Sequence, residues 1–322
     1  MLKTGLLHPY PGSKADRKKY PIWDGGNYDS VLEVFCGSGH FTTCMLLSGK
    51  VRQAFVADAD PAVGAVWHCW QSRLRRQLVS ENIDYLRAEI LFQPEKGFNM
   101  LKNIFNRLST LSLDSEKAAV SILIRRLTFG GVVRCNKQGE LNVALSQDKL
   151  RSFQSWEFEW PWFDDNQWDV SVSESWADAF TEFELSSAEN AICLIDPPYW
   201  VAPNSRSDRR GTGSLTPAYP MHGDPSGAAL FDLTVAAVDR ALSNPRIKRI
   251  VHTNYDSPQM GKAMIVLSAQ HNRACHATTL EPLQCMNKQQ QQRDDSPREV
   301  AWEWGGRRMF GRQQQLSLLE VA

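Results

Sequence analysis

The chain has 322 residues, of which 42% are hydrophobic and 22% charged, and its 36 basic and 36 acidic side chains give a net charge of zero. Its length suits one large domain or a core with an insert, and its composition is that of a soluble globular protein. The neutral net charge counts against a strongly basic nucleic-acid binder, without excluding a basic face. The sequence has no run of about 18 apolar residues and no signal-peptide core, so we expect neither a membrane span nor export.

The seven cysteines are scattered and form no Cys-x-x-Cys pair, and the seven histidines are equally dispersed. This pattern predicts reduced thiols in a cytoplasmic protein and no metal site.

The first elements along the chain predict a βαβ unit. Residues 31–35 indicate a strand, Gly37-Ser38-Gly39 a turn, and residues 41–47 a helix. A second strand at 54–57 ends at Asp58. Asp60-Pro61 then opens another helix, because proline suits a first helical turn.

The next stretch, residues 71–150, is polar and predicted to be mostly helical, with a turn at 136–139. Tryptophans crowd residues 153–176, and we expect them to form the core of a small subdomain rather than a surface for stacking bases. Arginine pairs such as Arg125-Arg126 are interpreted as solvated faces, with phosphate contact as the alternative.

The α/β pattern returns with a buried strand at 191–195. Residues 201–228 are rich in Pro, Ser, Gly and Arg and predict a loop that closes over a site, holds phosphate or only covers the surface. The rest predicts a helix at 229–242, strands at 247–252, 263–268 and 298–304, and a polar loop at 287–297. We therefore expect an α/β core of residues 1–70 and 171–322, with a mostly helical insert at 71–170 that carries a β-hairpin near 129–143.

The glycine turn and Asp58 together predict a cofactor site. Glycines after a strand let the backbone approach a ligand, and an acid about twenty residues further on suits ribose hydroxyls. The chain has no Walker lysine and no third glycine, so the pattern favours a sulfonium cofactor with an amino-acid tail over a phosphate-rich one. The alternative is that these residues only form turns.

The segment Asp196-Pro197-Pro198-Tyr199 follows the strand at 191–195. Ligands of open α/β sheets bind at the carboxyl ends of strands, and two prolines stiffen such a loop. A carboxylate, a free carbonyl and an aromatic ring suit a planar base held by its exocyclic amine.

These motifs, in this order, resemble the Dam-like (D12 class) DNA adenine-N6 methyltransferases. The resemblance covers residues 8 to 304 and rests on these segments: Pro11-Gly12-Ser13-Lys14, Leu32–Gly39, Ala57–Asp60, Thr128–Val143, Glu174–Asp178, Asp196–Tyr199, Thr216–Tyr219 and Thr253–Asp256. It implies a Rossmann-like S-adenosylmethionine-dependent methyltransferase core, double-stranded DNA as substrate, and a cytoplasmic or nucleoid-associated protein whose candidate partner is a restriction or phage-defence system. No membrane or metal partner is expected.

The resemblance also implies roles for single residues. The cofactor residues would be Tyr10, Gly12, Lys14, Glu33, Phe35, Gly37, Gly39, Asp58 for the ribose and Asp178 for the adenine. The catalytic residues would be Asp196, Pro197, Pro198 and Tyr199, with Tyr199 stacked on a flipped adenine. The DNA-recognition residues would be Arg134, Asn136, Lys137 and Tyr219.

The substrate stays open at this point. Related tetrapeptides serve RNA adenine and protein-glutamine methyltransferases, and a non-catalytic DNA-binding relative is a further alternative. The best-known GATC enzymes carry an aromatic residue where this chain has Cys135, so the target sequence also stays open.

Overall fold

The computed structural model describes residues 26–108, 113–131, 133, 136, 140–160, 168–199, 227–280 and 299–305. Six predicted site residues lie outside this part of the chain: Tyr10, Gly12, Lys14, Arg134, Lys137 and Tyr219. The predicted loop at 287–297 also lies outside it, as does the predicted loop at 201–228 except for its last two residues, which begin the helix Gly227–Ser243 instead.

The described strands form one seven-stranded sheet in the order β3-β2-β1-β4-β5-β7-β6. Their bounds are β1 Ser30–Glu33, β2 Gln53–Ala57, β3 Asp169–Ser173, β4 Ala191–Ile195, β5 Ile247–Tyr255, β6 Cys275–Thr279 and β7 Glu299–Trp304. The first five strands in that order are parallel, whereas β7 is antiparallel to both β5 and β6. The order reverses between β1 and β4, and such a switch point opens a ligand site at the carboxyl ends of the strands.

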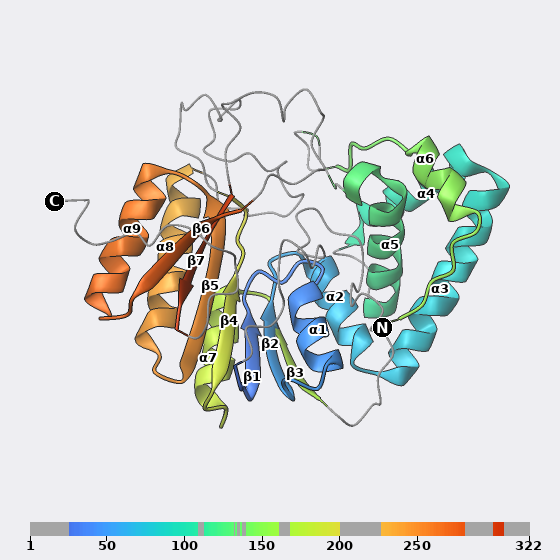
Figure 1. Ribbon diagram of the computed structural model, residues 1–322. Helices are drawn as coiled ribbons and strands as arrows, with labels where there is room; N and C mark the ends of the chain where they lie inside the picture. The colour runs from blue at the N-terminus through green and yellow to red at the C-terminus, as the bar shows by residue number, and fades with distance from the viewer. Residues whose placement is uncertain are drawn as a thin grey trace.

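Helices cover both faces of this sheet (Figure 1). One face packs against α1 (His40–Leu47) and α2 (Pro61–Trp70), and the other against α7 (Trp176–Leu185), α8 (Gly227–Ser243) and α9 (Pro258–Gln270). Two large hydrophobic clusters, one on each face, hold these layers together. The predicted α/β class is therefore confirmed, and the core is Rossmann-like.

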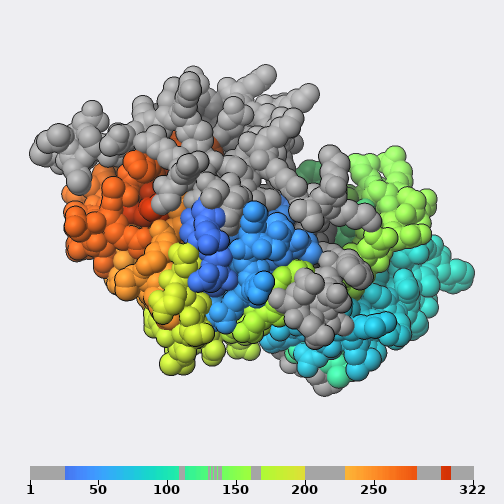
Figure 2. Space-filling view, turned by 60° about the horizontal axis from the view of Figure 1, so that its bottom comes forward, coloured from blue at the N-terminus to red at the C-terminus, as the bar shows by residue number. Residues whose placement is uncertain are grey.

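A block of four helices lies beside α2, at the end of the molecule opposite α8 and α9 (Figure 2). It consists of α3 (Arg73–Phe92), α4 (Pro94–Phe105), α5 (Asp114–Leu127) and α6 (Gln147–Phe153). A short 3-10 helix, η2 (Phe129–Gly131), comes directly after α5 in the chain. The hydrophobic cluster of the α1–α2 face continues into this block without a break. Trp156, Trp160 and Trp168 pack, half-buried, against that cluster, as expected, whereas Trp176 packs against the cluster on the other face of the sheet.

One predicted strand is wrong, and two strands of the sheet were not predicted. The predicted strand at 263–268 is wrong, because these residues lie in the middle of α9, which Ser257 caps by accepting from Met260 N (3.1 Å). Strands β3 and β6 were not predicted, since their polar sequences DVSVS and CHATT lack an apolar run. Within the described residues, no helix is long and apolar enough to cross a membrane.

Candidate functional site

The parallel strands bring three predicted acids to one edge of the sheet. Glu33 ends β1 and lies in register with Val56 of β2 and Leu194 of β4. Asp58 comes two residues after Val56, and Asp196 comes two residues after Leu194. The two acids therefore lie just beyond Glu33, on either side of β1. Asp196 and Asp58 are close enough to Glu33 for their negative charges to raise its pKa.

Glu33 is a buried carboxylate that caps α1. Its Oε2 accepts from the backbone N of Thr42 (3.0 Å) and from the Thr42 hydroxyl (2.5 Å). Burial raises the pKa of Glu33 to about 8, against the opposing effect of the Thr42 bonds. Among the described residues, no cation forms an ion pair with Glu33. A positively charged ligand group beside Glu33 would therefore be stabilised.

Asp58 holds the glycine turn in place. Its Oδ2 accepts from Gly37 N (2.8 Å) and its Oδ1 from Asp60 N (2.9 Å). A carboxylate offers about four lone-pair positions, so two remain for ligand hydroxyls. Burial, and then the charge of Asp60, raise the pKa of Asp58 to about 6.

The glycine turn depends on residues without a side chain. Gly37 and Gly39 have φ angles of 47° and 62°, a region that L side chains rarely adopt. A Cβ on Gly39 would lie 2.1 Å from Cζ2 of Trp67, which is fully buried in α2. Phe35, at the start of the turn, is half-buried against the α7–α9 face. The turn thus packs closely against α2 at Gly39, where a side chain would meet Trp67.

The segment Asp196–Tyr199 is anchored from β5 and β7. The Thr253 hydroxyl donates to Oδ1 of Asp196, and the Tyr199 hydroxyl donates to Oε1 of Glu299. The Tyr199 ring meets Tyr255 edge-on, with ring centroids 4.7 Å apart. Burial, and then the charges of Asp196 and Glu299, raise the pKa of Tyr199 well above its ordinary value, so this phenol stays neutral.

Asp178 lies in the first turn of α7, at the same edge of the sheet. Ser175, the N-cap, donates its hydroxyl to Asp178 Oδ2 (2.7 Å) and accepts from Asp178 N (3.1 Å). The side chain is exposed, so it remains accessible to a ligand as well as serving the cap. The structure therefore gives Asp178 a capping role that the sequence did not suggest.

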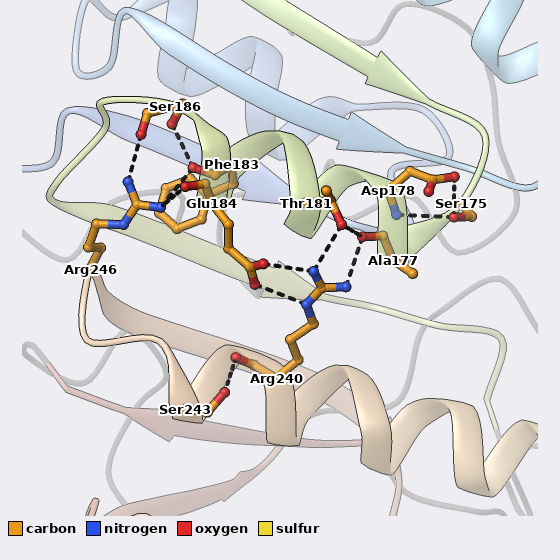
Figure 3. Close-up of polar contacts among 10 residues, drawn as sticks. All are labelled: Ser175, Ala177, Asp178, Thr181, Phe183, Glu184, Ser186, Arg240, Ser243 and Arg246. Atoms are coloured by element: carbon orange, nitrogen blue, oxygen red, sulfur yellow. Dashed lines mark hydrogen bonds and ion pairs between the residues drawn. The ribbon is translucent and has the colours of Figure 1, made fainter.

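Two arginines of the neighbouring elements hold α7 against α8 (Figure 3). Arg240 binds both carboxylate oxygens of Glu184 (3.0 and 2.9 Å) and the carbonyl of Ala177 (2.9 Å), beside Asp178. Arg246 donates to four carbonyls at the carboxyl end of α7, those of Phe183, Glu184, Ser186 and Ala188. Both ends of the helix that presents Asp178 are therefore fixed.

Two described residues of the predicted recognition hairpin, Asn136 and Glu140, are paired by hydrogen bonds. Asn136 N donates to the Glu140 carbonyl (2.8 Å), and Glu140 N donates to the Asn136 side chain (2.9 Å). The Asn136 amide also donates to the Glu140 carboxylate (3.0 Å). Asn136 is thus bound to Glu140 through both its backbone and its side chain, and its reading of a base stays a prediction.

The arginine pair is not a solvated face. Arg125 is 1% exposed and forms a buried ion pair with Asp60, so this part of the prediction is wrong. Arg126 is half-buried, and its guanidinium lies over the ring of Trp156, 5.4 Å from the centroid. Neither contact could be expected from two adjacent basic residues in a helical stretch.

Five residues that support the site had no predicted site role: Thr42, Asp60 as a partner of Asp58, Thr253, Tyr255 and Glu299. Thr253 and Tyr255 had one available signal, since they end the strand next to the one that precedes Asp196.

Within the described residues, no group of His, Cys, Asp and Glu could hold a metal ion. A cavity of about 400 Å³ between the end of α8 and Arg273 lies at the opposite edge, where β5 begins.

Comparisons with known proteins point to one family. The family model of the D12 class N6 adenine-specific DNA methyltransferases matches residues 18–208, more than half of the chain. Among curated proteins, none matches the chain. The methyltransferase domain of bacterial CtHen1-CN has 7% identity and a TM-score of 0.31, with 87% of this chain and 91% of that chain covered. Precorrin 8w decarboxylase from Methanobacterium thermoautotrophicum has 12% identity and a TM-score of 0.33, with 92% and 93% covered.

Proposed function

Because the chain belongs to the D12 class N6 adenine-specific DNA methyltransferases, we propose that it transfers a methyl group from S-adenosylmethionine to the N6 amine of an adenine flipped out of duplex DNA. One observation carries the proposal. Glu33, Asp58 and Asp196 meet at the carboxyl edge of the sheet, inside the matched range, and no described cation pairs with Glu33.

The residues fit this cofactor by charge. Glu33 would hold the ammonium group of the methionine part, because a buried carboxylate with a raised pKa gains most from a cation. Asp58 has two lone-pair positions left for the ribose hydroxyls. Gly37 and Gly39 would let the backbone approach, and Asp178 would contact the adenine of the cofactor. When bound, S-adenosylmethionine supplies an electrophilic methyl group on a positively charged sulfur.

Asp196 would act on the target base. Its carboxylate and the Pro197 carbonyl would accept hydrogen bonds from the two N–H groups of the adenine N6 amine. These bonds would stabilise the positive charge that develops on the nitrogen as the N–CH₃ bond forms. The methylated nitrogen would then release its extra proton to water, and S-adenosylhomocysteine would leave with the electron pair of the S–CH₃ bond. The Thr253 hydroxyl keeps one Asp196 oxygen in place, so the carboxylate is oriented before the base arrives.

Tyr199 would form the platform for the flipped base. A base inside a duplex is out of reach and must leave the stack. Stacking on an aromatic side chain contributes about 1–3 kcal/mol per base. Glu299 and Tyr255 restrain the Tyr199 ring from two sides, which supports a fixed platform.

The helical block and the segment after α5 would recognise the DNA. We propose that residues 71–170 form the target-recognition insert and that Arg134, Asn136, Lys137 and Tyr219 contact DNA. The position of α3–α6 beside α2, away from the α7–α9 face, supports this division (Figure 1).

The test is to express the chain in a host without DNA methylation and to map modified adenines by single-molecule sequencing. We expect one methylated sequence motif, and no methylation from Asp196→Ala, while that variant still binds S-adenosylhomocysteine in calorimetry. An unmodified genome, or tritiated methyl groups found only in RNA or protein, would overturn the proposal. Methylation by Asp196→Ala at the wild-type level would overturn the catalytic assignment alone.

A further inference from the structure

A buried ion pair joins the helical block α3–α6 to the cofactor edge, which is the edge of the sheet where Glu33, Asp58 and the glycine turn lie. Arg125 lies near the end of α5, and its guanidinium binds Asp60 Oδ2 and the Ser121 hydroxyl. The side chains of Arg125 and Asp60 are only 1% and 3% exposed. A buried charge pair demands close geometry, because each partner has lost its water.

Asp60 passes this constraint on to Asp58. Its Oδ1 caps α2 by accepting from Ala62 N (2.9 Å), and its backbone N donates to Asp58 Oδ1 (2.9 Å). Asp58 in turn holds Gly37 N (2.8 Å). A continuous set of polar contacts therefore runs from Arg125 through Asp60 and Asp58 to the glycine turn.

Arg125 also lies close in the chain to the predicted recognition segment, residues 128–143, which begins directly after α5. The C-cap of α5 is Thr128, whose N donates to the Ile124 carbonyl (3.1 Å). After this segment the chain returns to the same place, because Ser146 N donates to the Leu127 carbonyl (3.0 Å). A shift in the last turn of α5 would therefore move both ends of the segment.

We propose that Arg125 is a positioning residue that couples target recognition to cofactor binding, through its ion pair with Asp60. This inference rests on the proposed function. Since coupling between two sites is reciprocal, the mapped DNA site should tighten cofactor binding by the same factor by which the cofactor tightens DNA binding. Arg125 itself touches neither ligand in this scheme.

The experiment measures this factor by calorimetry with S-adenosylhomocysteine, with and without a duplex that carries the mapped site. For the wild type we expect the dissociation constant to fall about fivefold or more in the presence of the duplex. In the double variant Asp60→Asn/Arg125→Met the factor should fall to about one. Asparagine keeps the cap of α2, and no lone buried charge is left.

A second buried ion pair provides the matched control. Arg249 and Glu303, 1% and 0% exposed, join β5 to β7 far from α5. Arg249→Met/Glu303→Gln should also lower the melting temperature but keep the wild-type factor. Arg125→Lys, which retains the charge without the planar fork, should keep part of the factor and serves as the test if the double variant does not fold.

Several results would overturn the inference. A wild-type factor of one, a full factor in Asp60→Asn/Arg125→Met or in Arg125→Lys, or an equal loss in the Arg249→Met/Glu303→Gln control would each do so. If the genome map shows a methylated motif and the wild-type factor is one, only the coupling falls. If the map shows no methylated adenine, the proposed function and the coupling fall together.

Discussion

Replacing Thr253 by valine should slow methyl transfer without weakening cofactor binding. Thr253 is 1% exposed at the end of β5, and its hydroxyl donates to Asp196 Oδ1. Valine has nearly the same shape, so the strand should keep its packing while Asp196 loses one donor. The perturbation thus acts on the orientation of the catalytic carboxylate and on the Tyr199 side chain, with which Thr253 also shares a hydrogen bond.

The size of the effect follows from that hydrogen bond. A hydrogen bond to a charged group contributes about 1.5–3 kcal/mol, which corresponds to a ceiling of roughly 10- to 150-fold in rate. Since the bond exists before the reaction, only the part that strengthens in the transition state affects the chemical step. We therefore expect kcat to fall about 10-fold, near the lower end of this range, and the cofactor dissociation constant to change less than about twofold.

The assay is single-turnover transfer of tritiated methyl groups to a duplex with the mapped site, with calorimetry for the cofactor. Thr253→Ser keeps a hydroxyl at the same place and is the matched control, expected to remain within about threefold of the wild type. Transfer by Thr253→Val at the wild-type rate would refute the reasoning. Equal slowing of Thr253→Ser and Thr253→Val would show that packing, not the hydroxyl, matters.

Three more predictions concern the cofactor edge. Burial raises the pKa of Glu33 to about 8, so the native protein should lose stability as the pH rises from about 4.5 to 8. Glu33→Gln should remove this loss, which is on the order of a few kcal/mol at pH 8 in urea titrations. An equal dependence of the unfolding free energy on pH in both proteins would contradict this prediction. Asp58, with a pKa of about 6, should lose its negative charge as the pH falls below that value, so cofactor affinity should fall more steeply there in the wild type than in Asp58→Asn, which should bind the cofactor about 10-fold more weakly at pH 8. Parallel pH profiles of the two proteins in calorimetry would contradict this. Gly39→Ala should destabilise more than Gly49→Ala by about 1–3 kcal/mol, since both glycines have positive φ but only a Cβ on Gly39 would meet Trp67, and equal losses would rule out that clash.

Hydrophobic pattern and turn residues predicted most of the sheet. The βαβ unit from β1 to α2 and the strands β4, β5 and β7 agree with the predicted ranges, because their apolar runs end at glycine, proline or an acid. The run Met264–Leu267 was misleading. Its β-branched residues favour a strand, yet Ser257 and Pro258 form a helix start that the pattern of four residues cannot outweigh.

Contacts between distant residues set the limit of such prediction. Arg125 lies 65 residues from Asp60, and nothing in a helical stretch with two arginines indicates which one turns inward. The partners of Asp58 were within reach, since Gly37 and Asp60 belong to the motifs that predicted the site. Local motifs therefore identified the acids at the edge of the sheet, while the contacts that orient them required the packed structure.

The direction of β7 explains why Glu299 escaped notice. In a parallel sheet, site residues follow the carboxyl ends of strands, as Asp58, Asp196 and Tyr255 do. Strand β7 runs the other way, so its first residue, Glu299, arrives at that edge in register with Tyr255. An antiparallel strand inserted beside β5 thus delivers a buried carboxylate to the Tyr199 hydroxyl from its amino end. In such a sheet, the first residue of an antiparallel strand therefore lies at the same edge as the carboxyl ends of the parallel strands.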